Sequence, residues 1–253
     1  MDHSMGARTP ADPAAGMAAG APYVALPPAT PTRRTPLVVA WHGLEAPRTE
    51  RAMAAALPLA RLAAWRVYLR LHRSGAHASA TPLALEQALR LDAEASGPGV
   101  VGPMVQRAAA ELPAVLAALR AELSLAEGPI GLLGWSAGAA AALLALAENQ
   151  VPVRAAALVR PVIQVERLDL LPRVPEIAAQ DPQPAVLLVT GVRDDPGIGE
   201  PAERLWQALA DRYRAPGRAA LLLASERASR NADVLQVDAA VTDWFGRHLT
   251  KLT

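Results

Sequence analysis

The sequence predicts one α/β domain in which helices cover both faces of a mostly parallel central sheet. Short apolar runs alternate along the chain with longer segments whose apolar residues recur at helical spacing. Strands that alternate with helices pair in parallel through right-handed crossovers, which places the helices on the two faces of the sheet. The chain of 253 residues, 52% of them hydrophobic, is also long and apolar enough to bury one full core.

The apolar runs and the amphipathic segments divide the chain into expected elements. The runs expected to be strands are 37–41, 67–71, 130–133, 155–159, 185–189 and 219–223. The expected helices are 48–64, 104–123, 137–148, 201–213 and 234–249. Between two of the strands, the segment 160–184 lacks the pattern of a plain crossover helix, and we interpret it as a short cap or lid.

The start of the chain differs in composition from the rest. Residues 1–36 are dominated by Ala, Pro, Gly and Thr, a mixture that cannot form a long helix. We therefore expect residues 1–22 to be a flexible tail and residues 23–253 to form the α/β domain, with 23–26 adding an edge strand.

Charge and composition exclude several classes of partner. The chain has 25 basic and 24 acidic residues and no long basic block, so we expect no nucleic acid partner. Its longest apolar run, 137–147, is shorter than the roughly 18 residues of a membrane span, so we expect no membrane partner. The absence of cysteine excludes disulfides and thiolate sites, and no His, Asp and Glu cluster has ligand spacing, so we expect no metal and no cofactor. Without a signal-peptide pattern, the expected location is the cytoplasm.

The strongest chemical signal is a serine between a strand and a helix. In the segment 129–140, PIGLLGWSAGAA, an apolar run ends in the pattern G-x-S-x-G and an alanine-rich helix follows. Gly134 and Gly138 would allow the close approach that a sharp strand-to-helix turn requires. Such a turn would hold Ser136 at the carboxyl edge of the sheet, where open α/β folds bind ligands. The alternative is a turn of small residues with an incidental serine.

A second strand supports this interpretation. In the segment 37–44, LVVAWHGL, an apolar run is followed by His42 and Gly43. This segment resembles the oxyanion-loop strand of the α/β-hydrolase family, to which the serine motif also points. The resemblance implies that the backbone N–H groups of Leu44 and Ala137 point at the developing oxyanion. For His42 itself we expect a structural histidine that hydrogen-bonds the loop backbone rather than a group that transfers protons.

The resemblance also implies an acidic residue that orients the base. The segment 185–196, AVLLVTGVRDDP, is an apolar run followed by G-x-x-D and resembles the family's acid strand, with the serine before the acid in chain order. The match places the carboxylate at Asp194. Asp195 is the alternative, because a shift of one residue in the loop would exchange the two. Both aspartates could instead cap the turn before the next helix.

The family's base has no counterpart at its usual place. The resemblance puts a histidine on the loop after the last strand, but 224–233 reads ASERASRNAD. In that place Arg227, Ser229 or Asn231 would face Ser136, and none of these side chains can accept a proton near pH 7. The only later histidine, His248, would lie about 24 Å farther along the terminal helix and is expected to be a packing or surface residue.

Three further histidines are weaker alternatives for the base. His3 lies in the expected tail. His72 and His77 follow the strand 67–71 and would emerge at the same sheet edge as Ser136. They would approach the serine from the oxyanion side, where Asp194 could not readily orient the second ring nitrogen.

Two functions fit this pattern. The first is a serine hydrolase that cleaves carboxylic esters through an acyl-enzyme on Ser136, with a small-molecule ester or acyl compound as its partner. Because the usual base is missing, we expect weak activity. The second is a catalytically inactive protein that keeps the fold and binds a small ligand or a protein. The sequence leaves the oligomeric state open.

Overall fold

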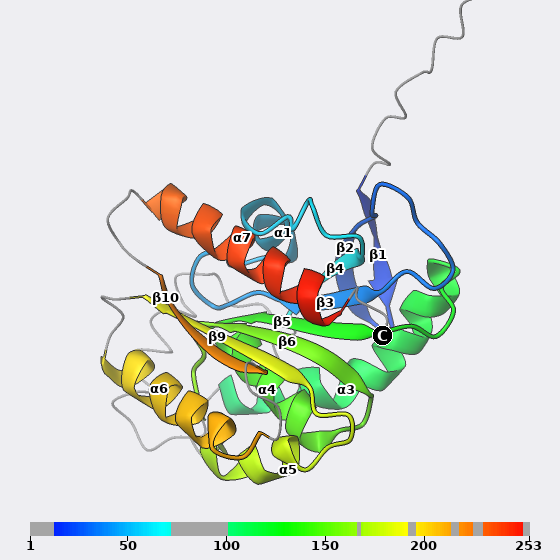
Figure 1. Cartoon of the computed structure of the whole chain (residues 1–253). Coiled ribbons are helices and arrows are strands. Elements are labelled where there is room, and N and C mark those ends of the chain that lie inside the picture. Colours follow the sequence, from blue (N-terminus) through cyan, green and yellow to red (C-terminus); the bar gives the residue numbers. More distant parts are fainter. Residues whose placement is uncertain are drawn as a thin grey trace, which may run out of the picture.

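A computed structural model of the chain describes residues 13–71, 101–165, 168–191, 196–213, 218–224 and 230–249. These residues form an eight-stranded sheet in the order β1-β2-β4-β3-β5-β6-β9-β10 (Figure 1). The strands from β4 to β10 in this order pair in parallel, whereas β1 and β2 are antiparallel to their neighbours. The predicted mostly parallel α/β fold is therefore confirmed. The strands are β1 (Ala14–Ala18), β2 (Ala21–Leu26), β3 (Leu37–Trp41), β4 (Trp65–Leu69), β5 (Ile130–Trp135), β6 (Val153–Val159), β9 (Ala185–Gly191) and β10 (Ala219–Ala224).

Helices cover both faces of this sheet (Figure 1). One face carries α1 (Glu50–Ala56) and α7 (Arg230–His248), and their apolar residues share a hydrophobic core with that face. The opposite face and its larger core carry α3 (Val101–Glu122), α4 (Ala137–Glu148), α5 (Val174–Ala178) and α6 (Pro196–Ala210). None of the helices in the described ranges is long and apolar enough to cross a membrane.

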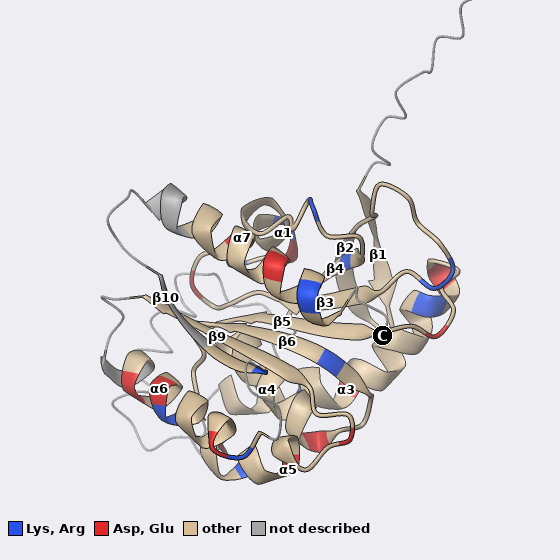
Figure 2. Cartoon of the chain, in the orientation of Figure 1, with Lys and Arg blue, Asp and Glu red and all other residues tan. Residues whose placement is uncertain are grey.

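The helix α4 is the most buried of these helices and follows the predicted bounds. Its residues from Ala137 to Ala147 are all buried. Figure 2 shows charged residues mainly on the outer helices and loops, while β3, β5 and α4 carry none before Glu148. A short helix that is apolar on every side belongs in a protein core, which explains why α4 packs on β5 and β6 and against α3 and α5.

Two elements near the start of the chain differ from the prediction. The strand β1 lies within the stretch 1–22 that was expected to be a flexible tail, and it pairs with β2. As a result β2, which contains the expected edge strand 23–26, lies between β1 and β4 rather than at the edge. The residues of β1, AAGMA, have no alternating apolar pattern, so pairing with β2 and not local sequence accounts for the strand.

The predicted helix 48–64 is correct only in its first part. Thr49 caps α1 with its Oγ1, which accepts the Ala52 N–H at 3.1 Å. The helix ends at Ala56, because proline disfavours the helical conformation in the residue before it and Leu57 precedes Pro58. The remaining residues form a loop in which Leu59 has a positive φ of 45°.

The segment 160–184 connects the neighbouring parallel strands β6 and β9. It contains a small hairpin of β7 (Gln164–Val165) and β8 (Leu168–Asp169), a 3-10 turn at Leu171–Arg173, and α5. The helix α5 packs on α4 and α6, so this part of the segment is a crossover on the face of the sheet. A covering role for the hairpin stays a prediction.

Candidate active site

Ser136 lies between the end of β5 and the start of α4, as the motif predicts. Its backbone has φ 54° and ψ −115°, and 5% of the residue is exposed. A residue other than glycine in this region carries about 1–3 kcal/mol of strain, which the surrounding structure must hold in place. Here the Ser136 N–H donates to the Val159 carbonyl at 2.9 Å, and α4 begins at the next residue, Ala137. The serine therefore occupies a sharp, strained turn at the carboxyl edge of the sheet.

The two motif glycines allow the turn through close backbone contacts. A β-carbon on Gly134 would lie 2.3 Å from the Gly138 carbonyl oxygen. A β-carbon on Gly138 would lie 2.2 Å from the carbonyl oxygen of Trp41 at the end of β3. Both neighbours are backbone atoms that cannot rotate away. The sharp turn and the close approach of β3 thus depend on glycine at both positions.

The His42-Gly43 pair packs directly against the serine. A β-carbon on Gly43 would lie 3.0 Å from the Ser136 β-carbon, so the loop after β3 touches the nucleophile. The next peptide carries the Leu44 N–H. On the other side, Ala137 is the first residue of α4, and its N–H has no acceptor within the helix. Of the predicted oxyanion donors, Ala137 follows Ser136 directly in the chain, and Leu44 follows the Gly43 that packs against it. Their role as donors stays a prediction.

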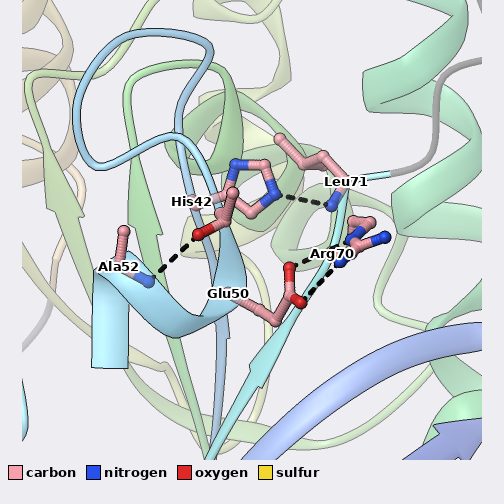
Figure 3. Close-up of polar contacts among 6 residues, drawn as sticks. His42, Glu50, Ala52, Arg70 and Leu71 are labelled. Carbon is pink, nitrogen blue, oxygen red and sulfur yellow. Dashed lines mark hydrogen bonds and ion pairs between the residues drawn. The ribbon is translucent and has the colours of Figure 1, made fainter. Parts of the chain in front are cut away.

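His42 is buried and both of its ring nitrogens are engaged. Figure 3 shows the contact of one of them with Leu71. The Leu71 N–H lies 3.1 Å from Nε2, and since an amide N–H can only donate, Nε2 is the acceptor. Nδ1 then carries the proton and donates to the Gly43 carbonyl at 2.7 Å. A neutral ring with both nitrogens occupied cannot take a proton from Ser136. His42 is a structural histidine in this arrangement, as expected.

An ion pair lies beside the His42 ring (Figure 3). Arg70 donates from Nε to Glu50 Oε2 at 3.0 Å and from Nη2 to Oε1 at 2.7 Å. Burial raises the pKa of Glu50, but the hydrogen bonds from Arg70 and from the Glu50 backbone offset this, and the net pKa lies below its ordinary value. The side-chain hydrogen bonds to Glu50 raise the pKa of Arg70. The pair joins the first turn of α1 to the end of β4.

The hydroxyl of Ser136 has a partner that the sequence analysis missed. Its Oγ donates to Oε1 of Glu45 at 3.2 Å. Glu45 is exposed and follows the His-Gly pair on the same loop. The signal that could have found it is its position, because the loop that carries the proposed Leu44 donor must also lie close to the nucleophile. A carboxylate is the one type of neutral-pH base, other than imidazole, that such a loop can readily present.

Comparison with known proteins identifies the fold. No protein-family model and no curated protein sequence matches the chain. The protein TT1662 from Thermus thermophilus has a TM-score of 0.67 at 19% identity, over 95% of this chain and 99% of that one. A dienelactone hydrolase from Anabaena variabilis has a TM-score of 0.59 at 19% identity, over 94% and 99% of the two chains. The acylaminoacyl peptidase of Pyrococcus horikoshii has a TM-score of 0.61 at 14% identity, over 96% of this chain and 42% of the peptidase.

The chain has the α/β-hydrolase fold. In this fold the nucleophile, the acid and the base follow different strands at one edge of the sheet. Here β9 ends at Gly191 and β10 at Ala224, and both run parallel to β5, so the loops after them begin at the edge that holds Ser136. Asp194 and Asp195 lie in 192–195, outside the described residues. The choice between them as the acid stays a prediction.

The candidate bases are placed only in part. His72, His77, Arg227 and Ser229 lie outside the described residues. Asn231, expected in a loop, falls in the first turn of α7, which begins at Arg230. His248 packs on Trp244, with ring centroids 4.2 Å apart, which fits its expected packing role. Among the residues that the structure describes, no group of three or more His, Asp and Glu could hold a metal ion.

Proposed function

We propose that the chain is a serine hydrolase that cleaves carboxylic esters through an acyl-enzyme on Ser136, with Glu45 as the group that receives the hydroxyl proton. The observation that carries this proposal is the hydrogen bond from the Ser136 hydroxyl to Glu45, at a serine held on a strained turn. Structural neighbours named dienelactone hydrolase and acylaminoacyl peptidase support a hydrolase at this coarse level. We choose esters because they make the smallest demand on a site without the usual base.

The reaction would take place in two balanced halves. Ser136 Oγ attacks the ester carbonyl carbon while its proton passes to Glu45, and the oxyanion accepts from the Leu44 and Ala137 N–H groups. The C–O bond to the alcohol then breaks, and Glu45 returns the proton to the leaving oxygen. Water then adds to the acyl carbon while its proton passes to Glu45, the bond from that carbon to Ser136 Oγ breaks, and Glu45 returns the proton to Oγ as the carboxylic acid leaves. Each half restores the carboxylate of Glu45.

A carboxylate base sets the expected speed of this reaction. In model peptides the pKa of a glutamate side chain is about two units below that of imidazole, so glutamate is the weaker base. Taking a hydroxyl proton is therefore harder than in a serine-histidine site, and general-base help is worth about 10²–10⁴-fold in rate. We propose slow turnover, in which activation of the nucleophile and not binding of the ester is limiting.

The test measures hydrolysis of p-nitrophenyl acetate and butyrate by the purified full chain. Ser136→Ala should reduce the enzymatic rate to background, and Glu45→Gln should lower kcat about 100-fold. Glu111→Gln, which removes a partly exposed carboxylate that pairs with Arg107 on α3, is the matched control and should leave kcat unchanged. A fluorophosphonate probe should label the wild type at Ser136.

One observation favours the non-catalytic alternative. Within the described ranges the only histidine at this edge, His42, has both ring nitrogens engaged. Wild-type turnover equal to that of Ser136→Ala, together with no labelling of Ser136, would support a ligand-binding role and overturn the hydrolase proposal. Turnover that needs Ser136 but not Glu45 would leave the hydrolase and remove Glu45 as the base.

A further inference from the structure

The peptide between Gly43 and Leu44 connects His42 to the proposed oxyanion hole. Its carbonyl accepts from His42 Nδ1 at 2.7 Å, and its N–H belongs to Leu44. In a planar trans peptide the C=O and the N–H point in opposite directions. A ring that holds the carbonyl on one side therefore aims the Leu44 N–H to the other. The α-carbon of Gly43 lies against Ser136, so the direction of this peptide matters for an oxyanion formed at the serine.

Only one protonation state of the ring satisfies both of its partners, because a cationic ring would still donate to the carbonyl but would place Nε2–H against the Leu71 N–H. Gly43 offers an oxygen, which needs a donor at Nδ1, and Leu71 offers an N–H, which needs an acceptor at Nε2. The neutral ring with its proton on Nδ1 satisfies both. In the other neutral tautomer Nε2–H would face the Leu71 N–H, and a bare Nδ1 would face the carbonyl oxygen.

The second anchor of the ring is itself held in place. Leu71 follows Arg70, whose side chain makes the two-bond pair with Glu50. The Arg70 N–H donates to the Pro22 carbonyl at 2.9 Å, which ties the same segment to β2. Glu50 is nearly buried, with 5% of its side chain exposed, and lies in the first turn of α1. The end of β4 is thereby fixed on two sides where it meets His42.

We infer that His42 and the Glu50–Arg70 pair form one positioning unit that aims the Leu44 N–H at the oxyanion. His42 acts through the Gly43 carbonyl, and the ion pair acts through Leu71. None of the three side chains touches the reacting atoms, so they are positioning residues. This inference rests on the proposed function of Ser136 for its effect on rate, but the direction of the peptide can be measured without catalysis.

The first experiment measures that direction by nuclear magnetic resonance on the full chain. The ring nitrogen shifts of His42 should report a neutral ring protonated at Nδ1. The Leu44 amide resonance should move in Arg70→Met and in His42→Leu relative to the wild type. Arg107→Met, which breaks a similar pair with Glu111 on α3, should leave it in place. The inference would be overturned by a cationic His42 ring at neutral pH, or by a Leu44 amide resonance that moves in neither the His42 variant nor the Arg70 variant. Both results hold whether or not the chain is an enzyme.

The second experiment measures kcat and KM with p-nitrophenyl butyrate. Loss of an oxyanion donor costs about 10²–10³-fold in kcat, so His42→Leu should lower kcat about 100-fold with KM nearly unchanged. His42→Asn, whose amide N–H can still reach the Gly43 carbonyl, should recover most of the rate. Arg70→Met should lower kcat about 5–10-fold.

The double variant separates a unit from independent effects. If His42 and Arg70 act through the same peptide, His42→Leu with Arg70→Met should be no slower than His42→Leu alone. His248→Leu, a matched loss of a histidine that packs on Trp244, should leave kcat unchanged. Additive losses, a rise in KM at constant kcat, or no rescue by asparagine would contradict the positioning role.

Discussion

A β-carbon on Gly138 would stand 2.2 Å from the carbonyl oxygen of Trp41 and 2.7 Å from that of His42. The helix α4 thus meets the end of β3 with no room for a side chain. We predict that Gly138→Ala destabilises the fold by about 2–3 kcal/mol and displaces Ser136, because the atoms in the way are backbone. Urea unfolding and the rate of fluorophosphonate labelling measure the two effects.

The control for this prediction is another helical glycine. A β-carbon on Gly246, in α7, would meet no atom within 4 Å. Gly246→Ala should therefore stabilise the fold by up to about 1 kcal/mol, as alanine does in an open helix position. A Gly138→Ala variant as stable as the wild type would show that α4 and the end of β3 can move apart at little cost in free energy.

The strain at Ser136 makes a separate prediction. Its φ of 54° with ψ −115° suits glycine and not a residue with a β-carbon. Ser136→Gly should be more stable than Ser136→Ala by about 1 kcal/mol, although both should be inactive. Thermal unfolding of the two variants side by side gives the comparison. Equal stability would mean that the surroundings do not hold the serine in a strained conformation.

The fold was predictable where one segment of sequence determines it. The bounds of α4 follow from the glycine turn before it and from Asn149, whose left-handed conformation ends it. The end of α1 was missed because apolar residues continue at helical spacing through 57–64, while Pro58 and side chains from distant elements impose a loop. The strand β1 has no pattern of its own and depends on β2.

The site was predictable to the same extent. The serine turn and the His-Gly loop are local, and both lie where the motifs place them. The Ser136–Glu45 bond joins residues 91 positions apart, and the His42 tautomer depends on Leu71, 29 positions away. These contacts depend on how the ends of different strands lie relative to one another. The residue pattern along any one strand does not predict that placement.

The Glu50–Arg70 pair gives a prediction for pH. Because the folded-state pKa of Glu50 is lowered, the pair stabilises the fold above the ordinary glutamate pKa, and this stabilisation is lost as pH falls through the folded-state value. Arg70 is 51% exposed, so solvent screening limits the gain to about 1 kcal/mol. Wild type should exceed Glu50→Gln by that amount at pH 7, and the gap should narrow as the pH falls below the ordinary glutamate pKa.

A more exposed pair serves as the control for that titration. Glu176 pairs with Arg173 one turn away, and its side chain is 47% exposed. Glu176→Gln should change stability by less than about 0.5 kcal/mol at pH 7. Urea unfolding of the three proteins between pH 3 and pH 8 measures the stability gap, and a gap between wild type and Glu50→Gln that widens toward low pH would contradict this prediction.

The last prediction concerns Arg66, which holds the loop 57–64 against the sheet. It is buried on β4 and donates to the carbonyls of Leu59 at 3.2 Å, Leu62 at 3.3 Å and Pro27 at 2.6 Å. From α7, Asp238 accepts the Leu59 N–H at 2.9 Å and joins the same loop. Burial lowers the pKa of Arg66 and raises that of Asp238, because removing either charge from water is unfavourable. The hydrogen bonds to the loop offset this unfavourable free energy.

Arg66→Met should therefore destabilise the fold by about 3 kcal/mol, since methionine fills the space but leaves buried carbonyls without donors. Arg154→Met, on a strand in the same sheet but only partly buried, is the control and should cost less than about 1 kcal/mol. Urea unfolding measures both, and amide exchange should show earlier opening of the Leu59 and Leu62 amides in Arg66→Met. The loop joins α1 to β4 and, among the described residues, makes no hydrogen bond to Ser136. At low temperature, where the variant is still folded, its kcat for ester hydrolysis should therefore stay close to that of the wild type. A large loss of kcat in a folded Arg66→Met protein would instead place Arg66 in the machinery around Ser136.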